Sequence, residues 1–248
     1  MIGCIIQARM GSSRLPGKVL MKVDNDESIL SFLIKQLNFC KSKFKIIIAT
    51  TLLPQDDIIE NFALKNDILF FRGDEDNVLD RYYKCAKKFS LNTIIRIPSD
   101  KPLIDPIVVD DIIQLFQKNN FDYVTNFLPL TFPAGTEVEI FSFEALEKTW
   151  LNATLLSEKE HVTPYMYDKK NNFKIFNVIN PVDLSHFRWV VDRIEDYDLV
   201  RKIIQGINNR PIVTNQIISF LKNNPKFFQI NQGIDYFEGY KKSKLKDT

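Results

Sequence analysis

The sequence has few of the residues that build disulfide frameworks or metal clusters, and no segment long and apolar enough to cross a membrane. Among its 248 residues are three cysteines and two histidines. Cys4, Cys40 and Cys85 are widely separated and odd in number, which argues against a disulfide framework and a CxxC metal site. No apolar run approaches the roughly 20 residues of a membrane span, and arginines interrupt the N-terminus where a signal peptide would be apolar. We therefore expect a soluble protein of the reducing cytoplasm, with no membrane partner.

The chain also lacks an excess of charge of either sign. Thirty-three Lys and Arg face 31 Asp and Glu, which gives a net charge of +2. Proteins that bind nucleic acids usually carry a strongly basic balance, so we expect no nucleic-acid partner. With 45% hydrophobic residues, the length allows one large α/β domain with a sizeable core. The function must then lie in local sites.

Short β-branched runs alternate with amphipathic segments through the first half of the chain. This alternation predicts βαβ units around a mostly parallel sheet. The predicted strands are Ile2–Ile6, Lys45–Ala49, Ile68–Phe71, Thr93–Ile97 and Tyr123–Asn126. The predicted helices are Ser28–Asn38, one opening at Pro54, one from Asp76 and Pro106–Asn119.

The rhythm breaks over residues 128–180, which we interpret as an insertion that serves substrate or subunit contacts. Here Glu137–Phe141 alternates as a strand with one wet face, which suits a cleft wall or an edge that pairs with another subunit. The chain returns to the core at Phe187–Val191 and begins a helix near Asp192. Residues 223–248 form a tail whose basic end, Lys241–Lys246, is expected to be solvated or frayed.

A loop rich in cations and small residues follows the first predicted strand, in the segment Ile5–Leu20, IIQARMGSSRLPGKVL. It is no Walker A motif, because five residues separate Gly11 from Gly17 and Val19 stands where Ser or Thr should bind magnesium. It is no G-x-G-x-x-G fingerprint either. A solvated surface loop is the plainer alternative, but the convergence of cations, hydroxyls and glycines favours phosphate binding. The candidate ligands are Arg9, Gly11, Ser12, Ser13, Arg14 and Lys18.

Two distant aspartates are candidates for a second part of this site. Asp100 follows a buried strand, and ligands of open α/β sheets bind beyond the carboxyl ends of strands. Asp192 also follows a β-rich run, so both can meet at one sheet edge. The alternatives are a turn former for Asp100 and a helix N-cap for Asp192. Two carboxylates that meet at one sheet edge could hold a divalent metal ion.

The loop resembles the N-terminal signature of CTP-dependent cytidylyltransferases that activate acidic sugars, including the sialic acid and 3-deoxy-manno-octulosonate enzymes. The likeness is greatest to the subgroup of the spore coat polysaccharide biosynthesis protein SpsF. It extends over nearly the whole chain, through FRGDEDNVLDRYY, RIPSDKPLIDP, FPAGTEVEIFSFEALE, EKEHVTPYMY, RWVVDRIEDYDLVR and the tail NQGIDYFEGYKKSK. The resemblance implies a Rossmann-like, GT-A-like nucleotide-diphospho-sugar transferase fold, an α/β/α sandwich with a mixed, mostly parallel sheet. A single nucleotidyltransferase domain would then span residues 1–222.

The resemblance also implies roles for individual residues. Arg9, Arg14 and Lys18 would hold the triphosphate of CTP, and the backbone around Ala8 would seat base and ribose. Asp100 and Asp192 match the two magnesium-binding aspartates of the octulosonate enzymes. Further candidates are Arg72 and Arg81 for nucleotide or sugar anions, and Glu137, Glu139 and His161 for the acceptor. Arg81 also has the alternative of a surface ion pair with Asp80, and His161 that of a structural hydrogen bond or subunit contact.

Two departures from the family pattern lie close to these candidates. The octulosonate enzymes carry Gly-Asp-Glu-Pro where this chain has Ser99–Pro102, so Lys101 replaces an acid beside the metal site. Glu137 stands where aspartate is expected in much of the subgroup.

The resulting hypothesis is a Mg²⁺-dependent cytidylyltransferase that transfers CMP from CTP to an acidic sugar for surface polysaccharide biosynthesis and releases pyrophosphate. A homodimer is expected from the resemblance and from the edge-like strand Glu137–Phe141. A glycosyltransferase of similar fold and a non-catalytic nucleotide-binding protein are the alternatives. The three cations of the loop favour a triphosphate over a nucleotide-sugar donor, and retention of both aspartates argues against a non-catalytic protein.

Overall fold

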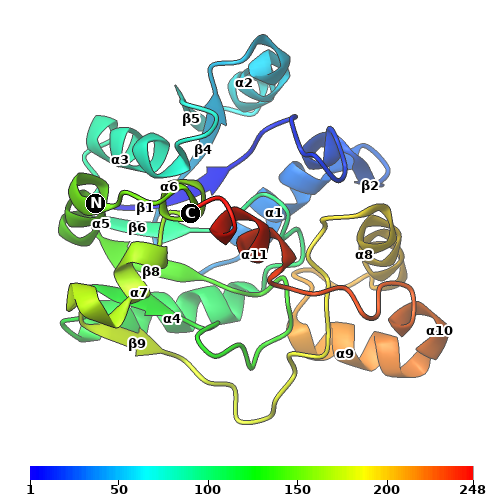
Figure 1. Ribbon diagram of the computed structural model, residues 1–248. Helices are drawn as coiled ribbons and strands as arrows, with labels where there is room; N and C mark the ends of the chain where they lie inside the picture. The colour runs from blue at the N-terminus through cyan, green and yellow to red at the C-terminus, as the bar shows by residue number, and fades with distance from the viewer. Residues whose placement is uncertain (248) are drawn as a thin grey trace.

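The computed structural model describes residues 1–247 and contains one seven-stranded sheet with helices on both faces (Figure 1). The strands are β1 Ile2–Gln7, β2 Lys22–Asp24, β3 Glu27–Ser28, β4 Lys45–Thr51, β5 Leu69–Gly73, β6 Thr93–Arg96, β7 Tyr123–Thr125, β8 Glu139–Ser142 and β9 Ile175–Asn177. The larger helices are α1 Ile29–Leu37, α2 Asp57–Lys65, α3 Val78–Lys88, α4 Pro106–Lys118, α5 Phe143–Asn152, α8 Ile194–Gly206 and α9 Thr214–Asn223. Shorter turns of helix are η1 Lys18–Leu20, η2 Pro54–Asp56, α6 Leu156–His161, α7 Pro164–Tyr167, η3 Lys169–Asn171, α10 Pro225–Phe228 and α11 Glu238–Lys244.

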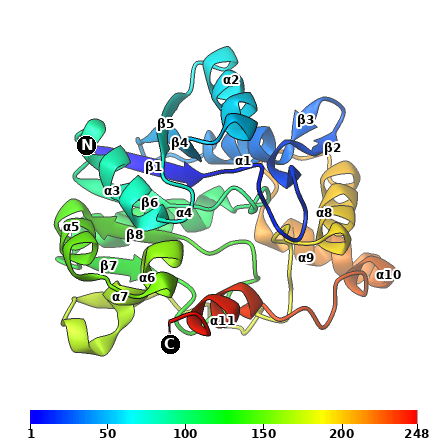
Figure 2. The same cartoon turned by 45° about the horizontal axis from the view of Figure 1, so that its top comes forward.

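The strand order is β5-β4-β1-β6-β8-β7-β9, and only β8 runs antiparallel to its neighbours. Side chains alternate across β1, so Cys4 and Ile6 pack on one face and Ile5 on the other. Helices α1, α2 and α4 cover the first face, while α3, α5 and α7 cover the second (Figures 1 and 2). The predicted three-layer fold with a mixed, mostly parallel sheet is confirmed.

The chain order of the strands reverses at β1. From β1 the chain moves outward to β4 and β5, and it then returns to place β6 on the other side of β1. The loops that leave β1 and β6 therefore open side by side at the carboxyl end of the sheet, which is the topological switch point where α/β sheets bind ligands. The cation-rich loop follows β1, and Asp100 lies in the loop after β6.

The prediction that Glu137–Phe141 forms an edge-like strand with one exposed face is wrong. The strand β8 begins at Glu139 and lies between β6 and β7, and the whole stretch Glu137–Phe141 is buried. The alternating pattern arises because Glu137 and Glu139 are charged residues with buried ion-pair partners, and not because one face is wet. The outer strands of the sheet are β5 and β9, so β8 offers no backbone to a second subunit.

The run before Asp192 is buried but belongs neither to the seven-stranded sheet nor to the small sheet formed by β2 and β3. Phe187–Val191 contributes a single bridge, between Ala134 and Arg188, and packs with α1, α8 and α9 in a third apolar cluster. The expectation that Asp192 follows a sheet strand is therefore wrong. It still reaches the switch point, because the Val191 amide donates to the Asp100 carbonyl at 2.8 Å.

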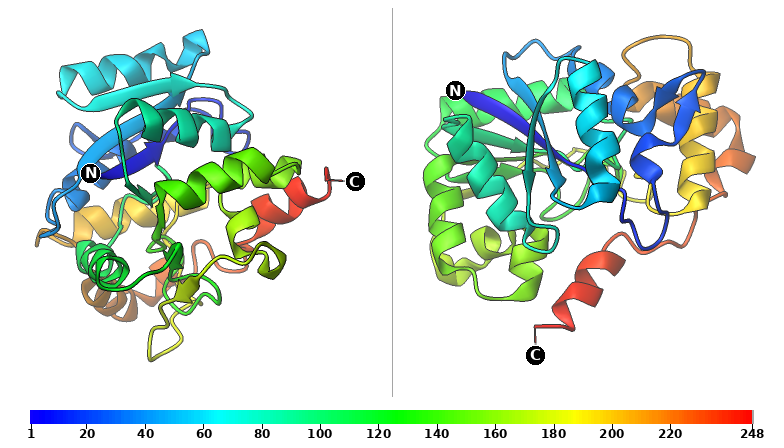
Figure 3. Two further views of the ribbon diagram at one scale, coloured as in Figure 1. Left: turned by 90° about the vertical axis from the view of Figure 1, so that its left-hand side faces the viewer. Right: turned by 90° about the horizontal axis from the view of Figure 1, so that it is seen from above.

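The C-terminal segment is also more ordered than a frayed tail. Residues Glu238–Lys244 form α11, which contacts α6 at the outer surface of the molecule (Figure 3). Lys241, Lys242, Lys244 and Lys246 are exposed, as expected, but Ser243 between them is buried. No helix within residues 1–247 combines the length and the apolar composition needed to cross a bilayer.

Candidate active site

The loop after β1 is fixed by a carboxylate from outside the loop and by a hydrogen bond within it. The buried carboxylate of Asp56 accepts a hydrogen bond from the Met10 amide at 2.6 Å and another from the Thr51 hydroxyl. Gly17 turns the chain with a φ of 72°, a value that glycine adopts without steric cost, and its amide donates to the Met10 carbonyl at 2.9 Å. The chain then enters η1, which carries the Lys18 side chain into the protein.

Lys18 joins the two predicted carboxylates. Its ammonium group lies 3.1 Å from Asp100 Oδ2 and 3.0 Å from Asp192 Oδ1, and it donates to the Val191 carbonyl at 2.6 Å. Burial alone would lower the pKa of Lys18, but Asp100 and Asp192 outweigh burial and raise it. The lysine thus stays charged, and it brings the loop after β1 and both aspartates to one point.

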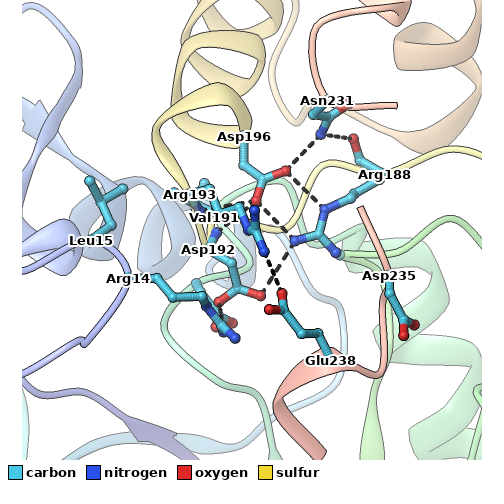
Figure 4. A network of polar contacts seen from close by, with 12 residues as sticks. Arg14, Leu15, Arg188, Val191, Asp192, Arg193, Asp196, Asn231, Asp235 and Glu238 are labelled. Carbon is cyan, nitrogen blue, oxygen red and sulfur yellow. Dashed lines mark hydrogen bonds and ion pairs between the residues drawn. The ribbon is translucent and has the colours of Figure 1, made fainter. Parts of the chain in front are cut away.

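Asp192 is surrounded by cations. In addition to Lys18, Arg14 lies 2.8 Å from its Oδ1 and Arg188 lies 3.4 Å from its Oδ2 (Figure 4). Burial by itself raises the pKa of Asp192, yet Lys18 and Arg14 outweigh it and hold the pKa well below its usual range. This carboxylate is therefore ionised at any pH at which the protein would work.

A second aspartate, Asp196, fixes the backbone beneath Asp192. Its fully buried carboxylate accepts from the Asp192 amide at 3.0 Å and the Arg193 amide at 3.1 Å. Arg188 binds both of its oxygens at 2.9 Å, and Asn231 donates to it at 2.8 Å (Figure 4). The capping role considered for Asp192 thus falls to Asp196, which leaves the Asp192 side chain free of the helix it precedes.

Within residues 1–247, one of the two carboxylate oxygens of Asp100 has no hydrogen-bond partner. Its Oδ2 contacts Lys18, while its Oδ1 is buried and has no hydrogen-bond partner within residues 1–247. A buried carboxylate oxygen without a partner is costly unless a ligand supplies one. Mg²⁺ is commonly bound by one or two carboxylates together with substrate phosphates, so this pair of aspartates fits such an ion. No group of three or more His, Cys, Asp or Glu that could hold a metal occurs in the described chain, so the phosphates would complete the coordination.

Two cavities meet at these aspartates. One, of about 330 Å³, is lined by the loop residues Ala8, Arg9, Ser12, Ser13, Arg14 and Lys18, and by Arg81 from α3. The other, of about 290 Å³, is lined by Arg96, Lys101, Glu139 and a group of aromatic side chains. Arg14, Asp100, His161 and Asp192 line both. We call them the phosphate cavity and the acceptor cavity.

Arg96, Lys101 and Glu139 of the acceptor cavity each have a buried ion-pair partner. Glu139 on β8 forms an ion pair with Arg96 on β6 and accepts from the Tyr123 hydroxyl at 2.9 Å. Lys101 lies 2.8 Å from Glu137, whose carboxylate also accepts from the Gly135 amide at 2.9 and 3.1 Å. The two departures from the family pattern, Lys101 and Glu137, are thus partners of each other.

Three of the predicted ligand residues line neither cavity. Glu137 is 1% exposed and lines neither cavity, so it acts on the site through its neighbours Lys101 and Tyr236. Arg72 lies away from both cavities and binds Asp57 at 2.6 Å and Glu60 at 2.7 Å. Gly11 lines neither cavity, although its neighbours in the loop do.

Arg81 lies in the phosphate cavity and not in a surface ion pair. It is 2% exposed and donates to the Asp74 carbonyl at 3.1 Å, and its Nε has no partner within residues 1–247. Asp80 pairs instead with Lys84 at 2.8 Å. Burial lowers the pKa of Arg81, and the nearby Asp56 and Asp74 do not offset it. A bound anion would supply the missing charge.

His161 lines both cavities and contacts the C-terminal helix. Its Nε2 lies 3.0 Å from the Ser243 hydroxyl, which donates to Glu160 at 2.6 Å. Because that hydroxyl hydrogen is given to Glu160, His161 is the donor in its own contact with Ser243. The next residue, Val162, has a φ of 71°, which is strained for a β-branched side chain, and such strain concentrates at functional sites.

Sequence reasoning missed part of this site. Arg188 and Asp196 stand four residues on either side of Asp192, a spacing that offers a signal for mutual contact in a helix but not in the loop that precedes α8. The contributions of Tyr236, Gly239, Tyr240 and Ser243 had no local signal at all.

Comparison with known proteins places the chain among enzymes. A family model described as Cytidylyltransferase matches residues 3–236. The spore coat polysaccharide biosynthesis protein SpsF of Bacillus subtilis is 32% identical over 234 residues, which cover 89% of this chain and 94% of that protein. A solved cytidylyltransferase from Leptospira borgpetersenii is 36% identical with a TM-score of 0.88, over 94% of this chain and 98% of that one. A CMP:2-keto-3-deoxy-manno-octonic acid synthetase solved with CTP, at 16% identity and a TM-score of 0.61 over 83% of this chain and 98% of that one, shares the fold.

Proposed function

Because the chain belongs to the cytidylyltransferase family and is a CTP-dependent nucleotidyltransferase, we propose that it transfers CMP to an acidic sugar of the 2-keto-3-deoxy or nonulosonic type. Pyrophosphate is the second product, and the activated sugar serves the synthesis of a surface polysaccharide. The observation that carries the proposal is the junction of the two cavities at Asp100, Asp192 and Lys18.

The reaction forms one bond to phosphorus and breaks another. A hydroxyl oxygen of the sugar attacks the α-phosphorus of CTP and its proton passes to water, while the bond from that phosphorus to the bridging oxygen breaks and pyrophosphate leaves with the electron pair. Arg9, Arg14 and Lys18 lie where they can neutralise the triphosphate, and Arg81 adds a buried cation whose Nε has no partner within residues 1–247. His161 lies between the cavities, where it can hydrogen-bond the acceptor or position the C-terminal helix.

Asp100 and Asp192 would hold Mg²⁺, which supplies charge neutralisation for the phosphates. The support for this assignment is the unpartnered buried Oδ1 of Asp100 and the ionised state of Asp192. On the protein's side, Lys18 keeps the two carboxylates together, and Asp196 fixes the backbone amides of residues 192 and 193.

A homodimer and a cytoplasmic location stay predictions. With β8 inside the sheet, the argument for a dimer rests on the resemblance to dimeric relatives alone.

The test is pyrophosphate release from CTP and MgCl₂ with a panel of acidic sugars. We expect Asp100→Ala to lower kcat by at least about a hundredfold and to retain CTP binding, since the loop cations remain. Asp111→Ala, at an exposed position on α4, is the matched control and should behave as the wild type. Near-normal turnover in Asp100→Ala would remove the assigned role. CTP binding without pyrophosphate release for every acceptor would overturn CMP transfer, and transfer from a nucleotide sugar would favour a glycosyltransferase.

A further inference from the structure

The C-terminal segment Tyr236–Lys246, which contains α11, forms a wall of both cavities. Tyr236, Phe237, Gly239 and Tyr240 line the acceptor cavity. Gly239, Lys242, Ser243 and Lys246 line the phosphate cavity. All but the first of these residues follow residue 236, the last that the family model matches. Figure 1 shows α11 in front of the carboxyl end of the sheet, on the side of α6.

Polar contacts hold this segment against the protein. Ser243 donates to Glu160 and meets His161, while Tyr240 packs edge-on against the His161 ring at 5.3 Å between ring centres. Asp247 accepts from the Ser157 amide at 2.8 Å and its hydroxyl at 2.6 Å. Glu238 binds Arg193 at 2.6 Å (Figure 4). Ser243 is the one buried residue of α11, so little apolar surface opposes its release.

The segment is preceded by an anchored residue, Asn231, and by a loosely packed glycine, Gly233. Asn231, which is 5% exposed, donates to Asp196 at 2.8 Å and to the Arg188 carbonyl at 3.2 Å. Two residues later, Gly233 has a φ of 80°, and a Cβ added there would meet no atom within 4 Å. The segment is therefore anchored to the same aspartate that supports Asp192, and a loosely packed glycine follows this anchor.

Two lysines of this segment, Lys242 and Lys246, line the phosphate cavity together with the loop after β1. Lys242 has a carboxylate partner at 2.7 Å in Glu238, on its own helix, while Glu238 also binds Arg193. Lys241 and Lys244 belong to the same helix but line neither cavity. Exposed ammonium groups at the mouth of a cavity that already contains Arg9, Arg14 and Lys18 suit a ligand of several negative charges.

We propose that this segment is part of the active site and closes over bound CTP, with Lys242 and Lys246 contacting the outer phosphates. The inference rests on the proposed function, because it takes CTP as the occupant of the phosphate cavity. Since the same segment presents Tyr236 and Tyr240 to the acceptor cavity, closure over the nucleotide also completes the acceptor site. CTP then binds before the acceptor.

Binding of CTP and CMP in the presence of MgCl₂, measured by calorimetry on the full chain, tests the proposal. In the double variant Lys242→Gln/Lys246→Gln, loss of two charge-assisted contacts should weaken CTP binding roughly ten- to hundredfold. CMP lacks the outer phosphates and should bind as to the wild type. The matched control, Lys241→Gln/Lys244→Gln, loses the same net charge from the same C-terminal segment and should leave CTP binding within about twofold.

The possible outcomes distinguish failure of the C-terminal contact from failure of the proposed function. Equal loss in both double variants would show a general charge effect and overturn the proposal, as would unchanged CTP binding in Lys242→Gln/Lys246→Gln. Equal weakening of CTP and CMP would overturn the contact with the outer phosphates. If the wild type itself binds no CTP, the proposed function fails. Because all four lysines are exposed, these variants should fold normally, which far-ultraviolet circular dichroism and thermal unfolding would verify.

Discussion

Replacing Asp196 by asparagine should lower the free energy of unfolding, because Asp196 supports the site without lining either cavity. Its carboxylate accepts five hydrogen bonds, from Arg188 twice, from Asn231 and from the amides of residues 192 and 193. Every one of these partners is a donor, so an amide group, whichever way it turns, places its own N–H₂ against a donor. The change also leaves Arg188 buried with one remaining carboxylate, Asp192 at 3.4 Å.

Removing one partner of a buried ion pair costs about 3–5 kcal/mol. With an unfolding entropy of about 2.1 cal/mol/K per residue, a loss of about 4 kcal/mol lowers the Tm of a chain of this length by about 8 °C. The reverse change, Arg188→Met, should cost only about 2 kcal/mol, because Asp196 keeps Asn231 and two backbone amides as donors. The two single variants are therefore expected to differ, although each removes the same ion pair.

Urea unfolding of the two single variants and of the double variant would measure this asymmetry. The double variant should lose less free energy of unfolding than the sum of the singles, since it leaves no buried charge unpaired. A loss below about 1 kcal/mol in Asp196→Asn, or equal losses in the two single variants, would refute the reasoning. Thr214→Ala, a change at the start of α9 away from this network, serves as a comparison.

Two further predictions concern residues whose placement differs from expectation or whose charge depends on burial. Arg72→Gln should leave CTP affinity unchanged while it lowers the free energy of unfolding by about 1–2 kcal/mol, because Arg72 binds Asp57, Glu60 and nearby carbonyls outside both cavities; weaker CTP binding by calorimetry would return it to the site. His161 has a pKa lowered by burial from 6.5, so the unfolded chain binds the extra proton first and stability falls as the pH drops below about 6.5. The urea midpoint of the wild type should therefore fall more between pH 7.5 and 5.5 than that of His161→Gln, and parallel declines would contradict the burial of a neutral ring.

The features that sequence alone predicted are those that depend on neighbours along the chain. The alternation of strands and helices identified β1, β4, β5, β6 and β7 and the layered fold, because periodicity records which face of each element is buried. The cation-rich loop was equally visible, since its glycines and charges lie within one short stretch. Asp100 was placed correctly by the general position of ligands beyond strand ends.

The features that the sequence did not predict depend on contacts between residues far apart in the chain. An alternating Glu-x-Glu strand predicts a wet face, yet both carboxylates are buried because Arg96 and Lys101 come from another strand and its loop. Nothing local to Glu137 or Glu139 identifies those partners. The lysine-rich end of the chain likewise gives an exposed composition, and its docking depends on Ser243 meeting Glu160 and His161 from a distant helix.

The position of β8 has a consequence for the order in which the protein is made. β6 pairs with β1 on one side, but its other neighbour in the finished sheet is β8, and Glu139 follows Arg96 by 43 residues. While the chain emerges from the ribosome, the outer edge of β6 is thus open and Arg96 has no carboxylate partner. An unpaired charge on an exposed strand discourages pairing with a wrong chain. Arg96, which pairs with Glu139 in a wall of the acceptor cavity of the folded enzyme, is thus placed to protect the nascent sheet until its correct strand arrives.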